Sequence, residues 1–318
     1  MNKALFAFAG VATSLMLGGA AVAATVGIGT TKGGATNLVA ATIAKVVTLK
    51  GHMQMRTQVM GGTQQYIPVV NAGEIPFGVS NLPQYWMART GTGMSKGTKY
   101  DNLRLAATLM PFRVGPTVAV RSGIKTLDDL KGKRVPYGFK AAPLFGFIME
   151  AFLADGGLTY TDVKKVPAVG LPQHWRMFKE DKIDVVISAA GTGAVKEMDA
   201  TVPGGVRYIS LDTSPAAVKR MLAIYPRSYI SEVKPAKGLT GVLEPVQMLF
   251  YDYMVWGNKD VPNETMYDVV KTMYQNAQDL KETSPIWHPF NRENMAKDQG
   301  TPYHPGAVKF YKEAGLMK

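Results

Sequence analysis

The spacing of apolar positions changes from one segment to the next in the first third of the chain. Val26 to Thr30 is a short apolar run, Asn37 to Val47 places apolar residues at helical spacing, and Met55 to Met60 alternates. A short helix is expected from Thr63, which can cap it, to Ala72, and Ile75 to Ser80 is again an apolar strand. The order strand, helix, strand, helix, strand predicts right-handed crossovers and a parallel sheet.

Much the same pattern returns roughly 108 residues further on. The second copy consists of KRVPYGFKAAPLFGFIMEAFLAD from Lys133 and VKKVPAVGLPQHWRMFKEDKIDVVISAAG from Val163. Two α/β units of this kind predict two lobes that face each other across a cleft. Such an arrangement suits a protein that closes on a small molecule.

Two further strands are expected between the copies, Leu105 to Met110 and Thr117 to Arg121, because Pro111 and Pro116 separate them. Later segments predict a strand and two helices, listed here in chain order: Val206 to Leu211, Pro215 to Ile224, and Thr265 to Leu280.

The aromatic run Met248 to Trp256 is favoured as a buried strand over an aromatic ligand cage. The first copy needs a partner strand from later in the chain, so we expect the chain to cross between lobes at Val118 to Arg121 and at Phe250 to Trp256. These two segments would form a hinge. The predicted division is residues 24–118 with 250–318 for the first lobe and residues 119–249 for the second.

The N-terminus has the pattern of a cleavable export signal. A basic start ending at Lys3 precedes the apolar or small residues Ala4 to Ala20, and Ala21-Val22-Ala23 is a small-x-small cleavage site. The alternative, a transmembrane anchor, is disfavoured because the apolar region contains glycine and hydroxyl residues and the cleavage site follows at once. We therefore expect residues 1–23 to be removed near Ala23 and the mature protein to be soluble and periplasmic.

Composition narrows the functional classes. The formal net charge is +12, but the basic residues form only short clusters, so nucleic acid is not an expected partner. The chain contains no cysteine, which excludes thiol nucleophiles, thiolate metal sites and disulfides.

The loop from Gly29 to Asn37 is the sharpest local feature. It lies between the carboxyl end of a predicted strand and the start of a helix, the edge at which open α/β sheets bind ligands. Glycine allows close backbone approach, and the free amides of a helix start favour an anion. A solvent-exposed turn with capping threonines is the structural alternative.

Other candidate ligand contacts are the residues at equivalent strand ends in both copies, together with two cations, Arg113 and Lys140, that can reach the cleft. The alternative for each cation is a solvated side chain. The full predicted set is Thr30, Thr31, Gly34, Ala35, Thr36, Asn37, Gly61, Gly62, Thr63, Ser80, Asn81, Arg113, Phe139, Lys140, Ala141, Ala190, Gly191 and Thr192.

The sequence contains no complete motif for catalysis or for cofactor binding. Gly27-x-Gly29 lacks the acidic residue that a dinucleotide site requires after the next strand, and no phosphate-binding loop with Gly-Lys-Ser/Thr occurs. The four histidines show no metal-ligand spacing, and no Gly-x-Ser-x-Gly elbow is present. We therefore expect no enzyme activity, no cofactor and no metal.

Several segments resemble the TAXI-type solute-binding proteins of tripartite ATP-independent periplasmic (TRAP) transporters. The most specific are GIGTTKGGATN from Gly27 and YHPGAVKFYKEAGL from Tyr303, with TQVMGGTQQYIPVVNAGEIPFGVSN from Thr57 and KIDVVISAAGTGA from Lys182 between them. The resemblance implies a type II periplasmic-binding-protein fold and delivery of a solute to a membrane permease driven by an ion gradient. It also implies ligands such as amino acids and small organic acids.

The chain departs from the family pattern at Gly138 to Pro143, where Phe139 and Lys140 stand in place of a Gly/Ser/Thr-rich loop. The leading hypothesis is a periplasmic protein, expected to be monomeric, that binds a small anionic, carboxylate-bearing ligand and delivers it to TRAP permease subunits. A ligand-sensing subunit acting on a membrane receptor and a periplasmic enzyme on the same scaffold are the alternatives.

Overall fold

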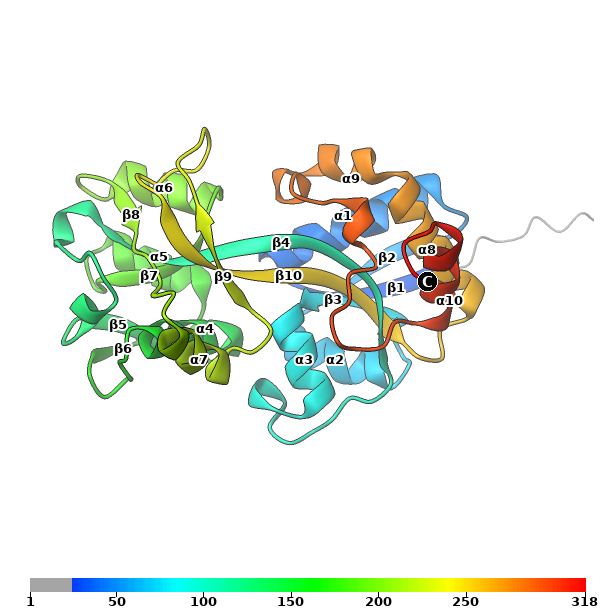
Figure 1. Cartoon of the computed structure of the whole chain (residues 1–318), viewed down its shortest axis with the longest axis horizontal. Helices are drawn as coiled ribbons and strands as arrows, with labels where there is room; N and C mark the ends of the chain where they lie inside the picture. The colour runs from blue at the N-terminus through cyan, green and yellow to red at the C-terminus, as the bar shows by residue number, and fades with distance from the viewer. Residues whose placement is uncertain (1–24) are drawn as a thin grey trace, which may run out of the picture.

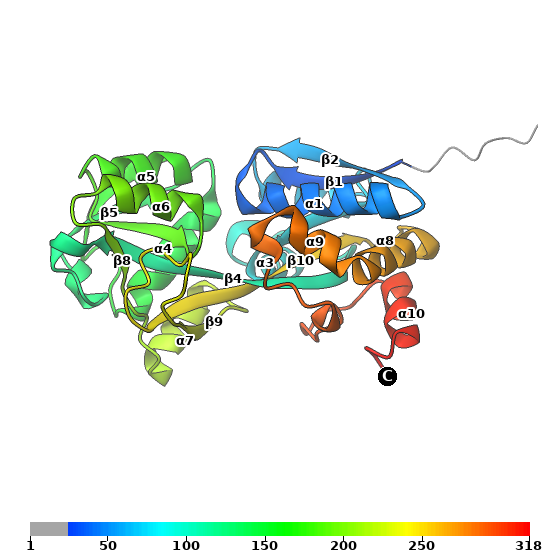
Figure 2. The same ribbon diagram turned by 90° about the horizontal axis from the view of Figure 1, so that it is seen from above.

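Two α/β lobes joined by a pair of long strands make up the computed structural model, which describes residues 25–318 (Figures 1 and 2). The expected signal segment, residues 1–23, lies outside the described residues. The first lobe begins with β1 (Thr25–Thr31), α1 (Gly34–Lys50), β2 (Gln54–Met60), α2 (Thr63–Asn71), β3 (Phe77–Asn81) and α3 (Leu82–Thr90). β1 lies between β2 and β3 and runs parallel to both, as the alternation of strands and helices predicts.

The second lobe repeats this order. It contains β5 (Arg134–Gly138), α4 (Pro143–Asp155), β6 (Lys164–Ala168), α5 (Leu171–Lys179), β7 (Val185–Ala189), α6 (Gly193–Thr201), β8 (Val206–Tyr208), α7 (Pro215–Ile224) and β9 (Tyr229–Val233). β5 and β6 pair in parallel as a sheet of their own, whereas β7 joins the main sheet.

The connection between the lobes is an antiparallel pair, β4 (Leu103–Ala119) and β10 (Val246–Asn258). The main sheet has the order β2-β1-β3-β10-β4-β7, with β8 beside β4 and β9 beside β10. β4 changes its partner at Val114: earlier residues pair with β10, and Val114 to Val118 pair with β7. One strand therefore belongs to both lobes.

The two strands expected on either side of Pro111 and Pro116 are in fact one continuous strand, β4. Pro111 lies opposite Asp252, beside a bulge in β10. The pairing of β4 with β7 on the other side starts only at Val114. Pro116 lies opposite Ile187 of β7, and on its other side, beyond the pairing with β10, its carbonyl oxygen accepts the N–H of Ile209 just after β8. Both prolines thus lie where the pairing of β4 with β10 is irregular or has ended, and a missing N–H is tolerated at such places.

Two helix expectations also need correction. Gly62, not Thr63, is the residue before α2, and no side chain caps that helix. The helix expected over Thr265 to Leu280 is two helices, α8 (Asn263–Gln275) and α9 (Ala277–Thr283), which meet at Asn276. The chain ends in α10 (Pro305–Glu313), which packs on α8.

Buried apolar side chains fill both lobes. The aromatic run in β10 is a buried strand, as predicted, and Trp256 at its end is fully buried between Tyr66 and Tyr85. Gly78 of β3 lies directly against this indole, since a Cβ there would come within 2.5 Å of Trp256 Cη2. Among residues 25–318, no helix has the length and apolar character needed to cross a membrane.

Candidate functional site

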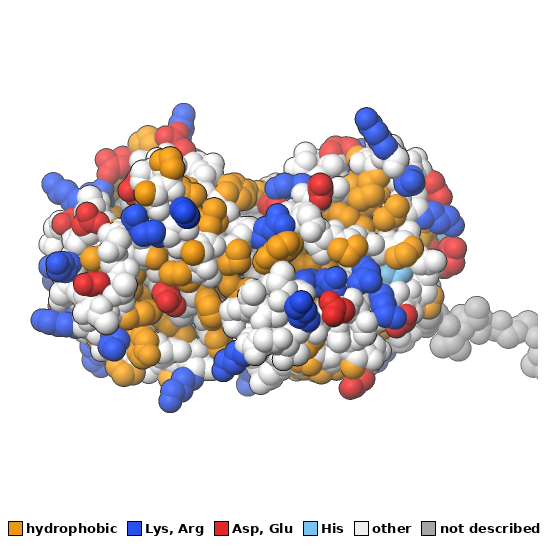
Figure 3. Space-filling model, turned by 60° about the horizontal axis from the view of Figure 1, so that its bottom comes forward, with side chains coloured by type: hydrophobic (Ala, Val, Ile, Leu, Met, Phe, Trp, Pro, Cys, Tyr) orange, Lys and Arg blue, Asp and Glu red, His pale blue; other side chains and the backbone are white. Residues whose placement is uncertain are grey.

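The carboxyl ends of the parallel strands in one lobe face those of the other lobe (Figure 2). The loop after β2 and the loop after β5 come close together, since a Cβ on Gly62 would lie 4.0 Å from the carbonyl oxygen of Ala141. Figure 3 shows the surface hollowed where the lobes meet. The predicted contacts of the two copies therefore lie at two facing edges.

The polar side chains in the loop after β1 mostly form hydrogen bonds within the loop itself. Thr30 Oγ1 donates to Thr36 O (3.1 Å), Thr31 Oγ1 donates to Gly33 O (2.8 Å), and Asn37 Nδ2 donates to Thr31 O (3.0 Å). Gly34 begins α1 with φ of 73° and open space around it, and no side chain caps the helix. The backbone amides of residues 34–36 are what this loop leaves for a ligand.

Tyr253 of β10 was not among the predicted contacts. Its hydroxyl lies 3.2 Å from Thr36 Oγ1, and burial raises the pKa of Tyr253 to about 12. The contact ties the first loop to the strand that joins the lobes. No sequence pattern marked this tyrosine, because it lies within a run that is otherwise core.

The ends of β2 and β3 offer fewer free groups than the sequence predicts. Gly61 donates its N–H to Gln65 Oε1 (2.7 Å), Thr63 is buried, and Ser80 Oγ accepts the indole N–H of Trp256 (3.0 Å). Asn81 differs from these. Its Oδ1 caps α3 by accepting from Gln84 N (2.9 Å), while its buried Nδ2 has no partner among the described residues.

In the second lobe, Phe139 does not present its ring to the cleft. The residue has φ of 41°, and its side chain is fully buried against Phe145 and His174. Burial also lowers the pKa of His174 to about 4, so this imidazole is neutral and structural. The rim of the loop consists of exposed Lys140 and Ala141.

The end of β7 is a tight turn. Gly191 has φ of 84°, Thr192 Oγ1 donates to Ala189 O (2.9 Å), and Ala190 donates its N–H to the carbonyl oxygen of Arg113 (3.2 Å). This last bond places the β7 loop directly beside β4. Arg113, 77 residues earlier in sequence than Ala190, is thereby brought to one of the predicted strand ends.

Arg113 is the most informative side chain at this edge. It is half-buried in β4, and its guanidinium has no carboxylate within ion-pair distance in the described part of the chain. Burial lowers the pKa of Arg113, and Tyr208 is the one neighbouring group that opposes this shift. A buried cation without a counter-charge is costly, so the site favours an incoming anion.

Residues 28–315 match the model of the NMT1-like family. Three solved structures share the fold at low identity. The periplasmic aliphatic sulphonate binding protein SsuA from Escherichia coli is 16% identical, with a TM-score of 0.50 and coverage of 93% of this chain and 94% of that one. PhnD1 from Prochlorococcus marinus in complex with methylphosphonate is 9% identical, with a TM-score of 0.56 and coverage of 92% and 99%. A TctC solute binding protein from Polaromonas is 14% identical, with a TM-score of 0.53 and coverage of 92% and 94%. These likenesses confirm the predicted α/β periplasmic-binding-protein fold.

Proposed function

The chain belongs to the NMT1-like family, and from that premise we propose that it is a periplasmic solute-binding protein that captures a small carboxylate-bearing ligand. The observation that carries the proposal is Arg113, a half-buried cation without an acidic partner in residues 25–318. A guanidinium forks onto a carboxylate with two parallel hydrogen bonds. The ligand would supply the missing negative charge.

The ligand is proposed to bind between the facing strand ends. The amides of residues 34–36 and the unpartnered Asn81 Nδ2 provide donors from the first lobe. Arg113 provides a cation from β4. In the turn at Ala190 to Thr192 the N–H groups of Ala190 and Thr192 are already bonded within the protein, so the second lobe provides the N–H of Gly191. All of these groups donate hydrogen bonds or carry positive charge, which supports an anion over a neutral or cationic solute.

Closure of two lobes around the ligand is part of this proposal. The lobes comprise residues 24–118 with 250–318 and residues 119–249, and β4 and β10 form the hinge. The partner change of β4 at Val114 supports a hinge there, a few residues before the predicted crossing at Val118 to Arg121, because the strand is held by a different neighbour on each side of Val114.

We also propose that the protein delivers its ligand to a TRAP-type permease. This proposal rests on the Gly-Thr loop from Gly27 and the terminal segment from Tyr303, which resemble TAXI-type proteins. In that role the mature chain, beginning near Ala24, would act as a monomer outside the cytoplasm. Uptake into vesicles containing the permease should then require an ion gradient and not ATP.

A thermal-shift panel tests the ligand class. The mature protein is heated with glutamate, 2-oxoglutarate, other amino acids and organic acids, and also with alkanesulfonates and methylphosphonate, because proteins sharing the fold bind such anions. A ligand at one hundred times its Kd stabilises by about 2.7 kcal/mol, which raises Tm by about 5 °C or more. A shift with sulfonates or phosphonates alone would overturn the carboxylate assignment, and no shift at all would contradict solute binding.

A further inference from the structure

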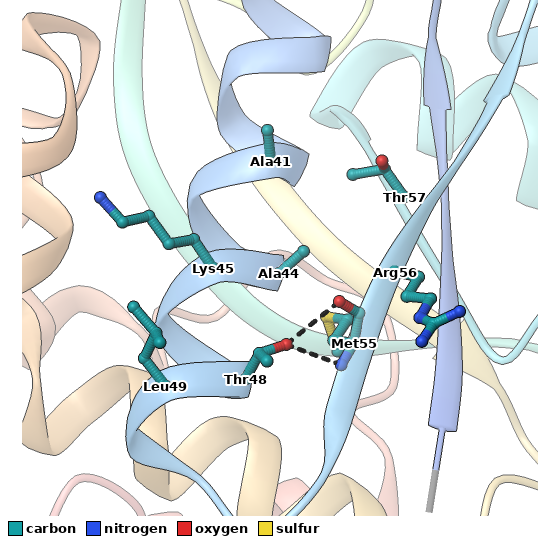
Figure 4. A pocket seen from close by; sticks show the side chains of 8 residues that line it. All are labelled: Ala41, Ala44, Lys45, Thr48, Leu49, Met55, Arg56 and Thr57. Carbon is teal, nitrogen blue, oxygen red and sulfur yellow. Dashed lines mark hydrogen bonds between the residues drawn. The ribbon is translucent and has the colours of Figure 1, made fainter.

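A second concave surface lies on the first lobe, away from the facing strand ends. It is a groove of about 430 Å³ between α1 and the outer edge of β2 (Figure 4). Among residues 25–318, β2 is the terminal strand of the main sheet and pairs only with β1. Unpaired edge strands are the surfaces to which extended peptides add.

The backbone of β2 faces this groove. Thr48 Oγ1 accepts a hydrogen bond from Met55 N (2.9 Å) and donates one to Met55 O (3.2 Å), so these backbone groups point away from β1 and toward α1. Backbone groups of alternate residues in a strand point to the same edge. Those of Thr57 and Val59 therefore also face outward, beyond the position that Thr48 covers.

The facing wall of α1 leaves room for a strand at that point. Ala41 and Ala44 are the helix residues opposite Thr57, and their small methyl side chains leave space between α1 and β2 (Figure 4). Thr48 lies at one end of the groove, and Ala41 and Thr57 lie at the other (Figure 4). Exposed Leu49 (67%) and Val59 (53%) supply apolar surface at the two ends.

Charge indicates what kind of strand would be accepted. Lys45 on α1 and Arg56 on β2 lie on opposite sides of the groove with their charged ends turned outward (Figure 4), and neither is ion-paired within the described residues. Among the described residues, none that lines this groove is acidic. Asp279, in the adjoining pocket on the far side of Lys45, is already ion-paired with Lys50. A second copy of this chain would bring the same two cations together, so self-association through this edge is disfavoured, whereas carboxylate side chains would pair with both rims.

We propose that the outer edge of β2, together with the Ala41/Ala44 wall of α1, binds an extended acidic segment of a partner protein, which adds to the sheet as a further strand. Main-chain hydrogen bonds to Thr57 and Val59 provide the affinity, and Lys45 and Arg56 select for carboxylates. The surface is separate from the ligand cleft, so the inference does not depend on the proposed solute.

The test uses the mature protein and fluorescent six-residue peptides that alternate valine with glutamate or with lysine. Fluorescence polarisation should show binding of the glutamate peptide at least tenfold tighter than of the lysine peptide, and weaker binding at higher salt. Hydrogen exchange should show protection at Thr57 and Val59 when the glutamate peptide is bound. Protection elsewhere, or equal binding of both peptides, would overturn the proposal.

Matched variants separate strand addition from a general attraction of charge. Thr57→Pro removes an outward N–H without breaking a bond to β1, so it should weaken binding at least tenfold, while Thr57→Ala should not. The double variant Lys45→Glu/Arg56→Glu should reverse the preference toward the lysine peptide, and Lys312→Glu on α10 should leave it unchanged.

Several results would count against the proposal. These are unchanged binding in Thr57→Pro, or dimerisation of the protein through β2. A third is binding of the fatty acid dodecanoate but of neither peptide, which would mark the groove as a site for an apolar chain. Each variant must retain the thermal stability of the parent protein to within about 2 °C, and Thr57→Ala provides the folded reference if the proline variant falls outside that range.

Discussion

At the scale of single residues, Arg113 is the side chain on which ligand affinity should depend most. Its half-buried charge has no acidic neighbour in the described structure. Arg113→Gln is expected to weaken binding of the best organic acid by thirty- to a hundredfold, which corresponds to about 2–3 kcal/mol for a lost charge-assisted interaction. Isothermal titration calorimetry on the mature protein measures this change.

Two further variants serve as controls for the Arg113→Gln measurement. Arg113→Lys keeps the charge and loses the fork, so it should fall between the parent protein and Arg113→Gln. Lys312→Gln, an exposed change on α10, should bind like the parent. Because the unliganded protein no longer buries an unpaired charge, Arg113→Gln should not lower its Tm. Unaltered affinity in Arg113→Gln would refute the role of this residue.

Asp155, at the end of α4, should make stability depend on pH. Its Oδ1 accepts the N–H of Asp212 (2.7 Å), its Oδ2 has no partner in residues 25–318, and burial raises the pKa of Asp155 to about 6. The folded carboxyl therefore keeps its proton between pH 3.8 and about 6, where the unfolded one has lost it. Stability from this group falls as pH rises through that window.

Asp155→Asn removes that dependence while keeping an acceptor at Oδ1. Relative to the parent, the variant should gain about 1–2 kcal/mol between pH 4.5 and pH 7.5, a figure reduced from the full pKa difference to allow for solvent screening. Urea unfolding at both pH values measures the gain. His174 acts in the opposite direction, since its lowered pKa costs stability as pH falls from 6.5 to about 4. His174 is present in both proteins, so its contribution cancels in the difference between their stabilities. If the free energies of unfolding of parent and variant ran parallel with pH, the role assigned to Asp155 would be disproved.

The sequence predicts which loops lie at the facing strand ends better than it predicts which of their polar groups stay free of partners. The strand ends were predictable because glycine and threonine mark the turns. The orientation of Phe139 was not, since its ring enters the core only because the backbone there has φ of 41°. Ser80 is likewise occupied by Trp256, which lies 176 residues away in sequence. Polar residues at a strand end are candidates whose free groups only tertiary packing decides.

At the scale of elements, the contact between β3 and β10 offers a test of the packing. A Cβ at Gly78 would meet Trp256 at 2.5 Å, and this indole is held between Tyr66 and Tyr85. Gly78→Ala should cost about 2–3 kcal/mol, because the indole must shift within a filled core. Urea unfolding followed by tryptophan fluorescence measures the loss.

Gly146 provides the matched control. It lies within α4, and a Cβ there would have no neighbour within 4 Å. Gly146→Ala should therefore stabilise the protein by about 0.5–1 kcal/mol through helix propensity alone. If the two substitutions had effects of the same sign, the packing argument for Gly78 would be wrong.

Most elements could be predicted from periodicity, and the failures have a common cause. The helix from Pro215 to Ile224 and the buried β10 follow from local pattern. The prolines of β4 predict two strands, because the local sequence does not show that Pro111 faces a bulge in β10 and that Pro116 lies beyond the end of that pairing. The break between α8 and α9 at Asn276 carries no glycine or proline to mark it.

At the scale of the whole molecule, the lobes touch at points other than the two connecting strands. The Arg227 guanidinium, between α7 and β9, lies 3.8 Å from the ring centre of Trp86 on α3. The loops at Gly62 and Ala141 meet across the facing strand ends. Motion about β4 and β10 would change the separation at Gly62 and Ala141, so this pair can report closure directly.

A double variant, Gly62→Cys/Ala141→Cys, turns that contact into a measurement. The natural chain has no cysteine, so the introduced pair contains the only thiols. A Cβ at Gly62 would lie 4.0 Å from Ala141 O, so the two loops are close enough for a small movement to bring the introduced Cβ atoms to the separation that a disulfide requires. Oxidation should yield an intramolecular disulfide, and ligand should accelerate its formation because closure brings the loops together.

The locked protein then shows whether closure traps the ligand. Protein oxidised with ligand present should release it at least tenfold more slowly than reduced protein, and protein oxidised without ligand should bind it correspondingly more slowly. Reduction should restore both rates, and the single variants, which can cross-link only between molecules, should behave like the parent. If the disulfide forms readily but ligand exchanges at the same rate in both states, the ligand does not bind between these loops, because a bridge across the mouth of a closing cleft must obstruct passage.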